Sequence, residues 1–347
     1  MLILLLVGLG TPACAAADAL ALSGVIQLGA YASREDGGND TNDLNLDAFS
    51  LGVTAQLNGY TLAELSMLYE EDATDPEVDI AAVMFGQENY PWALQAGQVY
   101  LPFGMYRTAL VNDVLVLEIA EHRALAAILG YHDYGVTVQT YLFQGDVNHA
   151  STSNDTLHNW GARLAWDSEP DDTDMGIGLE YISNMTDSNG IGDYLDDSWD
   201  DAVVGYGKND WLSNRVGAWI VHGYMHVGPV LFTGELLRAE SYRDADMESA
   251  DAALAPVGKA PRAWQVEVAY STQIHGHEVT FAAAMQQSQD VLFLELPRRR
   301  QSLGANVQLN SKTSIGVEVW RDHDYDMIDG GSDAHTSNIG LQLTREF

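Results

Sequence analysis

Three consecutive arginines are the clearest candidate in the sequence for binding an anionic solute. Arg298, Arg299 and Arg300 stand together in a chain that has only 16 lysines and arginines against 50 aspartates and glutamates. Guanidinium groups bind carboxylates through paired hydrogen bonds, so a triplet that faced a pore would attract carboxylate-rich solutes. The same arginines could instead pair with neighbouring acids or with lipopolysaccharide phosphates, and the sequence leaves both alternatives open.

An alternating series of aspartates, Asp322, Asp324 and Asp326, has the spacing with which a calcium-binding loop begins. An EF-hand loop also needs glycine at its sixth position and glutamate at its twelfth. Met327 and Asp333 occupy those positions, so the sequence excludes an EF-hand. We expect no cofactor, and only loose binding of divalent cations by acidic loops.

Residues 101–121 are largely apolar, with a few polar side chains distributed along them. A loop in water should be polar, whereas a segment folded into a barrel lumen packs apolar side chains on the wall and turns its polar groups to the pore. We therefore predict a constriction segment here. The candidate pore-lining residues are Arg107, Asn112, Asp113, Glu118 and Glu121. One more pair of strands, with a tight turn at residues 112–113, is an alternative that the same residues allow.

Alternation of apolar and polar residues predicts the strands that would position these side chains. In residues 336–347, Ile339, Leu341, Leu343 and Phe347 share one face, and mostly polar residues share the other, as in a half-buried strand. A closed barrel needs such a strand to pair with the first one, so that no sheet edge is left unpaired. Arg345 interrupts the apolar face, and we expect it at the level of the lipid headgroups.

The same alternation recurs along the whole chain. The alternating segments are residues 22–32, 49–57, 63–69, 78–85, 92–101, 123–131, 136–142, 160–166, 175–181, 215–225, 230–238, 264–270, 279–285, 303–309, 315–320 and 339–347. Short turns alternate with long acidic stretches such as residues 33–45, 70–75 and 184–212. On the predicted lumen face lie Glu64, Glu180, Glu235, Glu267, Glu278 and Glu318, which we expect to brace the wall with Arg163 and Arg215.

This organisation predicts an all-β fold, a closed antiparallel transmembrane β-barrel of about 16 strands spanning residues 20–347, with short periplasmic turns and long acidic extracellular loops. A soluble β-sandwich or jelly roll, whose strands also alternate, is the alternative. Residues 1–19 predict a secretory signal peptide, since a short apolar run is followed by small residues at each candidate cleavage site. Cys14, the only cysteine, would leave with it. The net charge of -34 argues against nucleic acid as a partner.

One stretch also resembles a known family. The pattern Gly97-x-x-x-Leu101-Pro-Phe-Gly104-x-Tyr106-x-Thr108, with Asp113 and Leu115-x-Leu117-Glu118-x-x-Glu121 beyond it, is similar to the signature of the LbtU-type siderophore porins. The resemblance implies an outer-membrane barrel that takes up ferric siderophore by diffusion without TonB. Val114 and Ala120 depart from the proline and glycine expected there. The resemblance supplies no ligand residues.

Together these features predict a porin of the bacterial outer membrane, not an enzyme, that passes a small polar solute, most specifically a ferric siderophore. A general or anion-selective diffusion porin is the alternative within that class. An outer-membrane barrel enzyme such as a phospholipase, and a soluble acidic calcium-binding β protein, are the alternatives from other classes. Expected partners are outer-membrane lipid and lipopolysaccharide. Porins of this size are often homotrimers, although the sequence identifies no subunit face.

Overall fold

A computed structural model describes residues 20–38, 40–71, 74–86, 90–145, 157–168, 174–194, 215–242 and 258–347. The predicted signal peptide lies outside these residues and stays a prediction. No helix among the described residues is long and apolar enough to cross a membrane.

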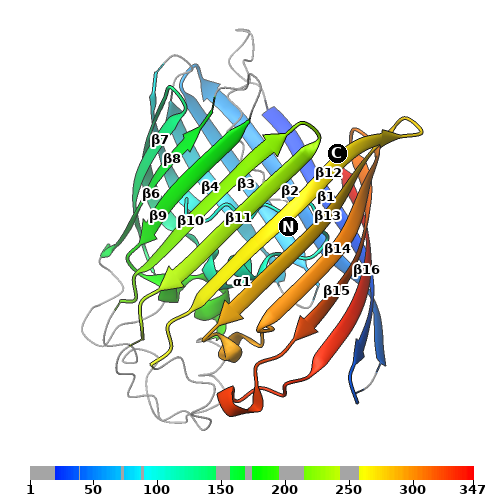
Figure 1. Ribbon diagram of the computed structural model, residues 1–347. Coiled ribbons are helices and arrows are strands. Elements are labelled where there is room, and N and C mark those ends of the chain that lie inside the picture. The colour runs from blue at the N-terminus through cyan, green and yellow to red at the C-terminus, as the bar shows by residue number, and fades with distance from the viewer. Residues whose placement is uncertain are drawn as a thin grey trace.

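Sixteen antiparallel strands close into one barrel, in which each strand pairs with its neighbours in the sequence (Figure 1). They are β1 (Leu20–Glu35), β2 (Asp40–Asn58), β3 (Thr61–Glu70), β4 (Thr74–Gly86), β5 (Trp92–Tyr100), β6 (Arg123–Asp133), β7 (Val136–Phe143), β8 (Asn159–Asp167), β9 (Met175–Ile182), β10 (Ala218–Val227), β11 (Val230–Ala239), β12 (Arg262–Ile274), β13 (His277–Gln289), β14 (Arg299–Asn310), β15 (Thr313–His323) and β16 (His335–Glu346). The short helix α1 (Leu115–Ala120) and the 3-10 turns Met185–Asp187, Leu292–Leu294 and Met327–Asp329 lie between strands. The predicted fold class and strand count are confirmed.

The last strand closes the sheet, as its alternation predicts. β16 pairs with β1 from Val25 opposite Glu346 to Glu35 opposite Thr336. Beyond this ladder, the Phe347 N–H donates to the Gly24 carbonyl at 3.1 Å. Closure pairs the backbone groups that an open edge would expose to lipid, which is the condition for a sheet to span a bilayer.

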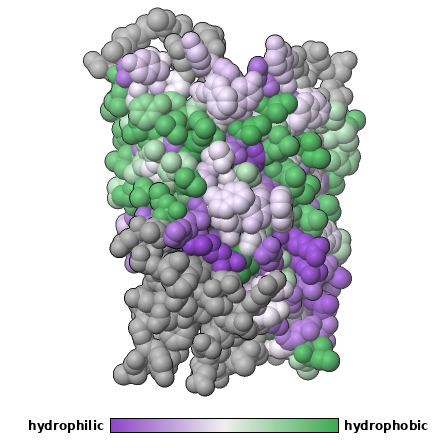
Figure 2. Space-filling model, turned by 90° about the vertical axis from the view of Figure 1, so that its left-hand side faces the viewer, coloured by the Kyte–Doolittle hydropathy of each residue, from purple (hydrophilic) through white to green (hydrophobic). Residues whose placement is uncertain are grey.

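The outer face of the barrel is apolar and the inner face is polar. On β14 to β16, Leu303, Val319 and Leu341 are about half exposed or more, whereas the alternating Ser302 and Glu318 are 4% and 1% exposed. A broad apolar band, bounded by more polar side chains toward the ends, is visible in Figure 2. An exposed apolar band on a closed sheet is the lipid-facing surface of an outer-membrane barrel.

Short turns gather at one end of the barrel, the upper end in Figure 1, as at residues 228–229 and 275–276. The longer connection of residues 324–334 lies at the other end, where β9 ends and β10 begins. Two expected long loops are shorter than predicted, because β1 and β2 extend into residues 33–45 up to Glu35 and from Asp40, and β3 and β4 extend into residues 70–75. Many of their polar residues pair as strands, for example Arg34 opposite Asp40, so the turn-prone composition extends beyond the turn itself.

Candidate pore constriction

The connection between β5 and β6, residues 101–122, is termed the inner segment below. It contains no strand, and its regular structure is the helix α1. The structure therefore does not contain the strand pair that was the alternative for residues 101–121. Phe103, Val116 and Ile119 of the segment are buried in a cluster with wall residues such as Ile128 and Ile220. Its apolar side chains pack against the barrel interior, which accounts for a composition unsuited to a loop in water.

Four glutamates on the barrel wall accept hydrogen bonds from this segment. These wall glutamates are Glu180 on β9, Glu235 on β11, Glu267 on β12 and Glu318 on β15, and each is at most 5% exposed. Irregular backbone inside a protein must find partners for its N–H groups, and carboxylates are strong acceptors. The wall glutamates supply those partners along successive parts of the segment.

The first two wall glutamates hold the start of the segment. The backbone N–H of Gly104 donates to Glu180. The next two N–H groups, of Met105 and Tyr106, donate to the two oxygens of Glu235, at 2.7 and 3.0 Å. Both oxygens of Glu235 are therefore occupied by backbone donors.

The other two wall glutamates, Glu267 and Glu318, hold the middle of the inner segment. Glu267 accepts from the Thr108 hydroxyl at 2.6 Å and from the Ala109 N–H at 2.8 Å. A single oxygen of Glu318, Oε2, accepts the N–H groups of Val111 and Asn112, both at 2.8 Å.

Further along, the Leu115 N–H at the start of α1 donates to Gln286 on β13 at 2.8 Å. The wall glutamates thus position the segment, a role that differs from the expected bracing with arginines. One pair of the expected bracing is present, since Nε of Arg163 lies 3.3 Å from a carboxyl oxygen of Glu180. Arg215 instead donates to Asn159.

Two glycines of the wall make room for the segment. A Cβ atom on Gly304 would lie 2.7 Å from Cδ2 of Leu110, and one on Gly316 would lie 2.8 Å from Cγ2 of Val111. Both distances are shorter than carbon atoms tolerate, so the absence of a side chain lets the segment lie close to β14 and β15.

Three predicted site residues of the inner segment, Asp113, Glu118 and Glu121, lie within electrostatic reach of one another. The surrounding protein removes water from the last two, and the charge of Asp113 adds to the effect. Together they raise the pKa of Glu118 to about 7 and the pKa of Glu121 to about 8. Asn189 donates to Glu121 at 3.1 Å.

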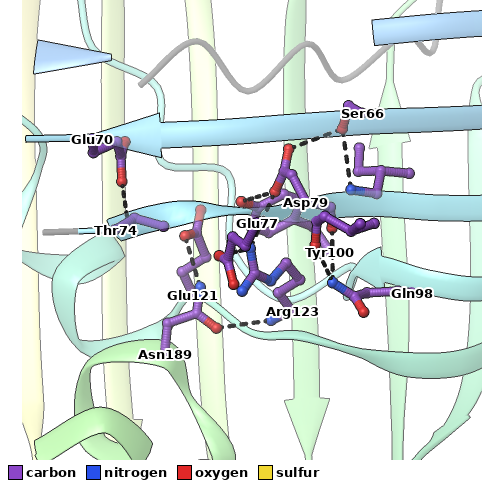
Figure 3. A network of polar contacts seen from close by, with 12 residues as sticks. Ser66, Glu70, Thr74, Glu77, Asp79, Gln98, Tyr100, Glu121, Arg123 and Asn189 are labelled. Carbon is purple, nitrogen blue, oxygen red and sulfur yellow. Dashed lines mark hydrogen bonds and ion pairs between the residues drawn. The ribbon is translucent and has the colours of Figure 1, made fainter. Parts of the chain in front are cut away.

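A second acidic group, which sequence reasoning missed, lies on β4 (Figure 3). Asp79 accepts from the Tyr100 hydroxyl at 2.7 Å and from Ser66 at 3.2 Å. Arg123 pairs with Glu77 and lies 3.5 Å from Asp79. Strict alternation would place Asp79 with the outward-facing Ala81. An irregularity in the β3–β4 register instead leaves it unpaired between Val78 and Ile80, and it turns inward.

The arginine triplet does not form one site. Arg300 makes two hydrogen bonds to Asp322, at 2.8 and 3.1 Å, and a longer one to the Asp113 carbonyl at 3.4 Å. Arg298 pairs with Asp326 in the connection after β15. Arg299 shares the outward face of β14 with Leu303, away from the lumen. One residue of the predicted triplet therefore contacts the inner segment.

The remaining predicted residues, Arg107 and Asn112, make other contacts. The guanidinium of Arg107 lies over the ring of Tyr224 on β10, 4.6 Å from its centroid. Asn112 contributes its backbone N–H to Glu318, and its side-chain nitrogen is buried without a partner among the described residues.

The alternating aspartates at the end of β15 and beyond it make separate contacts, in line with the exclusion of an EF-hand. Asp322 pairs with Arg300, and Asp324 accepts from Ser332. The side chains in the described part of the chain that could share a cation are His323, Asp326 and Asp333, whose ligand atoms lie within 4.8 Å of one another. Imidazole and carboxylate ligands together suit a divalent transition metal more than calcium.

No protein-family model matches the chain. A UPF0422 protein of Coxiella burnetii is 26% identical over 306 residues, which cover 85% of this chain and 62% of that protein. A UPF0422 protein of Legionella pneumophila (strain Lens) is 25% identical over 307 residues, which cover 83% and 56%. The chain therefore spans less than two thirds of the length of these relatives. They do not confirm the resemblance to siderophore porins, which stays a prediction.

Among solved structures, the outer-membrane channel DcaP of Acinetobacter baumannii superposes with a TM-score of 0.62 at 13% identity, covering 96% of this chain and 99% of that one. An anion-selective porin from Comamonas acidovorans gives 0.61 at 10% identity, covering 95% and 100%. OprB of Pseudomonas putida gives 0.60 at 10% identity, covering 95% and 94%. At these identities the similarity shows that the chain has the fold of an outer-membrane porin.

Proposed function

We propose that the chain forms a water-filled pore in the outer membrane, through which small polar solutes diffuse past a constriction made by the inner segment. The observation that carries the proposal is the row of wall glutamates. A segment held by the wall at four strands, β9, β11, β12 and β15, is fixed in place, and a fixed segment can narrow a lumen without closing it. Contacts with lipopolysaccharide and assembly into a homotrimer stay predictions.

Within this function, we propose a ferric siderophore as the solute. The support is the pattern over residues 97–121, which resembles the siderophore porins and which coincides with the end of β5 and the inner segment. The arginine triplet no longer supports a polycarboxylate siderophore, because its members are separated and two of them are paired with aspartates. A hydroxamate complex, which carries no excess carboxylates, suits the acidic residues of the constriction better.

Single-channel recording in a planar bilayer tests both levels of the proposal. The refolded chain should give a stable conductance, and a ferric hydroxamate siderophore should block it in a saturable way that the iron-free ligand does not reproduce. Open channels indifferent to the siderophore would leave a general diffusion pore. No conductance, together with hydrolysis of lipid by the same preparation, would favour the barrel-enzyme alternative.

A further inference from the structure

We infer that the constriction passes cations in preference to anions. This inference rests on the proposed pore and names the class of solute that the pore admits. It follows from which charged groups lie at the inner segment and the wall beside it, and from what each of them contacts.

Carboxyl groups come to the constriction from two parts of the chain. The inner segment contributes Asp113, Glu118 and Glu121, and the adjacent wall contributes Glu70 on β3 with Glu77 and Asp79 on β4. The two groups share one space, because the charges of both Asp113 and Glu70 act on Glu121. Figure 3 shows Glu121 of the inner segment on the same side as Glu70, Glu77 and Asp79 of the wall.

Direct contacts join the two groups. The amide of Asn189 donates to Glu121, while its oxygen accepts the backbone N–H of Arg123. The guanidinium of that arginine pairs with Glu77. Wall and segment are therefore one connected surface, and most of its ionisable groups are acids.

The nearby arginines do not offset these acids. Arg123 lies between Glu77 and Asp79, so one cation faces two carboxylates. Arg300 is held by both oxygens of Asp322. Arg107 lies on the ring of Tyr224, on the part of the segment that precedes the acidic residues. Among the described residues, an anion at the constriction would meet an excess of negative charge without an available cation.

The acids of the inner segment and of the adjacent wall lie close enough to act on one another, since the charges of Asp113, Glu70 and Glu118 all act on Glu121. At 0.1 M salt the screening length is about 10 Å, so charges lining a constriction act across its opening. Charged clefts of this kind raise the local concentration of oppositely charged ions about tenfold or more.

The preference for cations should increase with pH. Glu118 and Glu121, with pKa values of about 7 and about 8, are largely protonated at pH 6 and largely ionised at pH 9. Protonation removes negative charge, so the cation preference should be weaker at pH 6. Asp113 and the β4 carboxyls provide the preference that remains there.

The reversal potential in a KCl gradient across a planar bilayer tests the inference. We expect a potassium-to-chloride permeability ratio on the order of 10 at pH 9, and a ratio several-fold lower at pH 6 in the unmodified protein. The double variant Glu118→Gln with Glu121→Gln should give, at pH 9, the ratio that the unmodified protein gives at pH 6. Glu278→Gln is the matched control, since Glu278 lies near the β12–β13 turn, about 26 Å along β13 from Gln286.

The outcomes separate the inference from the proposed function. No conductance would refute the pore itself. An open channel that is unselective or prefers chloride would overturn the inference and leave the pore intact. A cation preference that is unchanged in the double variant and unchanged between pH 6 and pH 9 would also overturn it, because the selecting charges would then lie elsewhere. The pH comparison needs no substitution, so it stands even if the double variant fails to fold.

Discussion

Replacing Glu235 by glutamine should loosen the inner segment, whereas the same replacement at Glu318 should not. Both changes replace one carboxyl oxygen by an amide nitrogen and keep the size of the side chain. They differ in how many oxygens the native carboxylate uses. Glu235 uses both, with Met105 on Oε1 and Tyr106 on Oε2. Glu318 uses Oε2 for both Val111 and Asn112, and its Oε1 is buried without a partner among the described residues.

The expected magnitude follows from this difference. A glutamine has one acceptor oxygen, so in Glu235→Gln one backbone N–H faces an amide NH2 and loses its hydrogen bond. Leaving a buried donor unsatisfied costs about 1–3 kcal/mol. In Glu318→Gln the carbonyl oxygen can take the place of Oε2 and the NH2 the place of Oε1. Both backbone bonds then persist, and the cost should be below about 1 kcal/mol.

Hydrogen exchange measured by mass spectrometry on the detergent-solubilised barrel reports this difference. Peptides covering residues 104–109 should exchange about 5- to 150-fold faster in Glu235→Gln, the equivalent of 1–3 kcal/mol. Exchange over residues 108–112 should change little in Glu318→Gln. If the two variants protect the backbone N–H groups of the segment equally well, or lose that protection to the same extent, the claim that the wall glutamates hold the segment through its backbone is refuted.

Two further substitutions, each with a control, test the surroundings of the constriction. Gly190→Ala should displace α1 and change the single-channel conductance, because the new Cβ would lie 2.2 Å from the Glu118 carbonyl oxygen. In the control Gly234→Ala the nearest atom would lie 3.6 Å away, so the conductance should stay unchanged. Identical conductance in the two variants would contradict the packing described. Arg300→Gln should lower the free energy of unfolding by about 1–3 kcal/mol in denaturant titrations, because it leaves the half-buried Asp322 without its bidentate partner. Arg299→Gln on the outer face should have no measurable effect, and a larger loss there than at Arg300 would show the assignment of faces to be wrong.

Period-two alternation was enough to predict the barrel, because one residue per pleat must face lipid and the next must not. It also predicted which face carries Glu180, Glu235, Glu267 and Glu318. Their partners could not be predicted, since hydrogen bonds to an irregular segment far away in sequence leave no periodic signal. The expectation of arginine bracing was therefore correct for Glu180 with Arg163, and the backbone contacts were missed.

Local departures from the regular alternation of the strands account for the site residues that the sequence placed wrongly or missed. Asp79 faces inward because of one extra residue in β4, and no feature of the surrounding alternation marks that position. Arg298, Arg299 and Arg300 read as one cluster in sequence, yet a strand turns Arg299 and Arg300 to opposite faces, and Arg298 precedes the strand. A charge cluster within an alternating segment is therefore split by the geometry of the strand itself.

The contacts of the wall glutamates also determine which sequences the constriction can accept. At residues 104, 105, 106, 109, 111 and 112 the wall holds N–H groups, which every amino acid except proline supplies. Side chains such as those of Arg107 and Asn112 can therefore be exchanged while the anchoring bonds stay the same. We expect substitutions at these two side chains to change the permeability of the proposed pore while the wall and its bonds to the segment stay as they are.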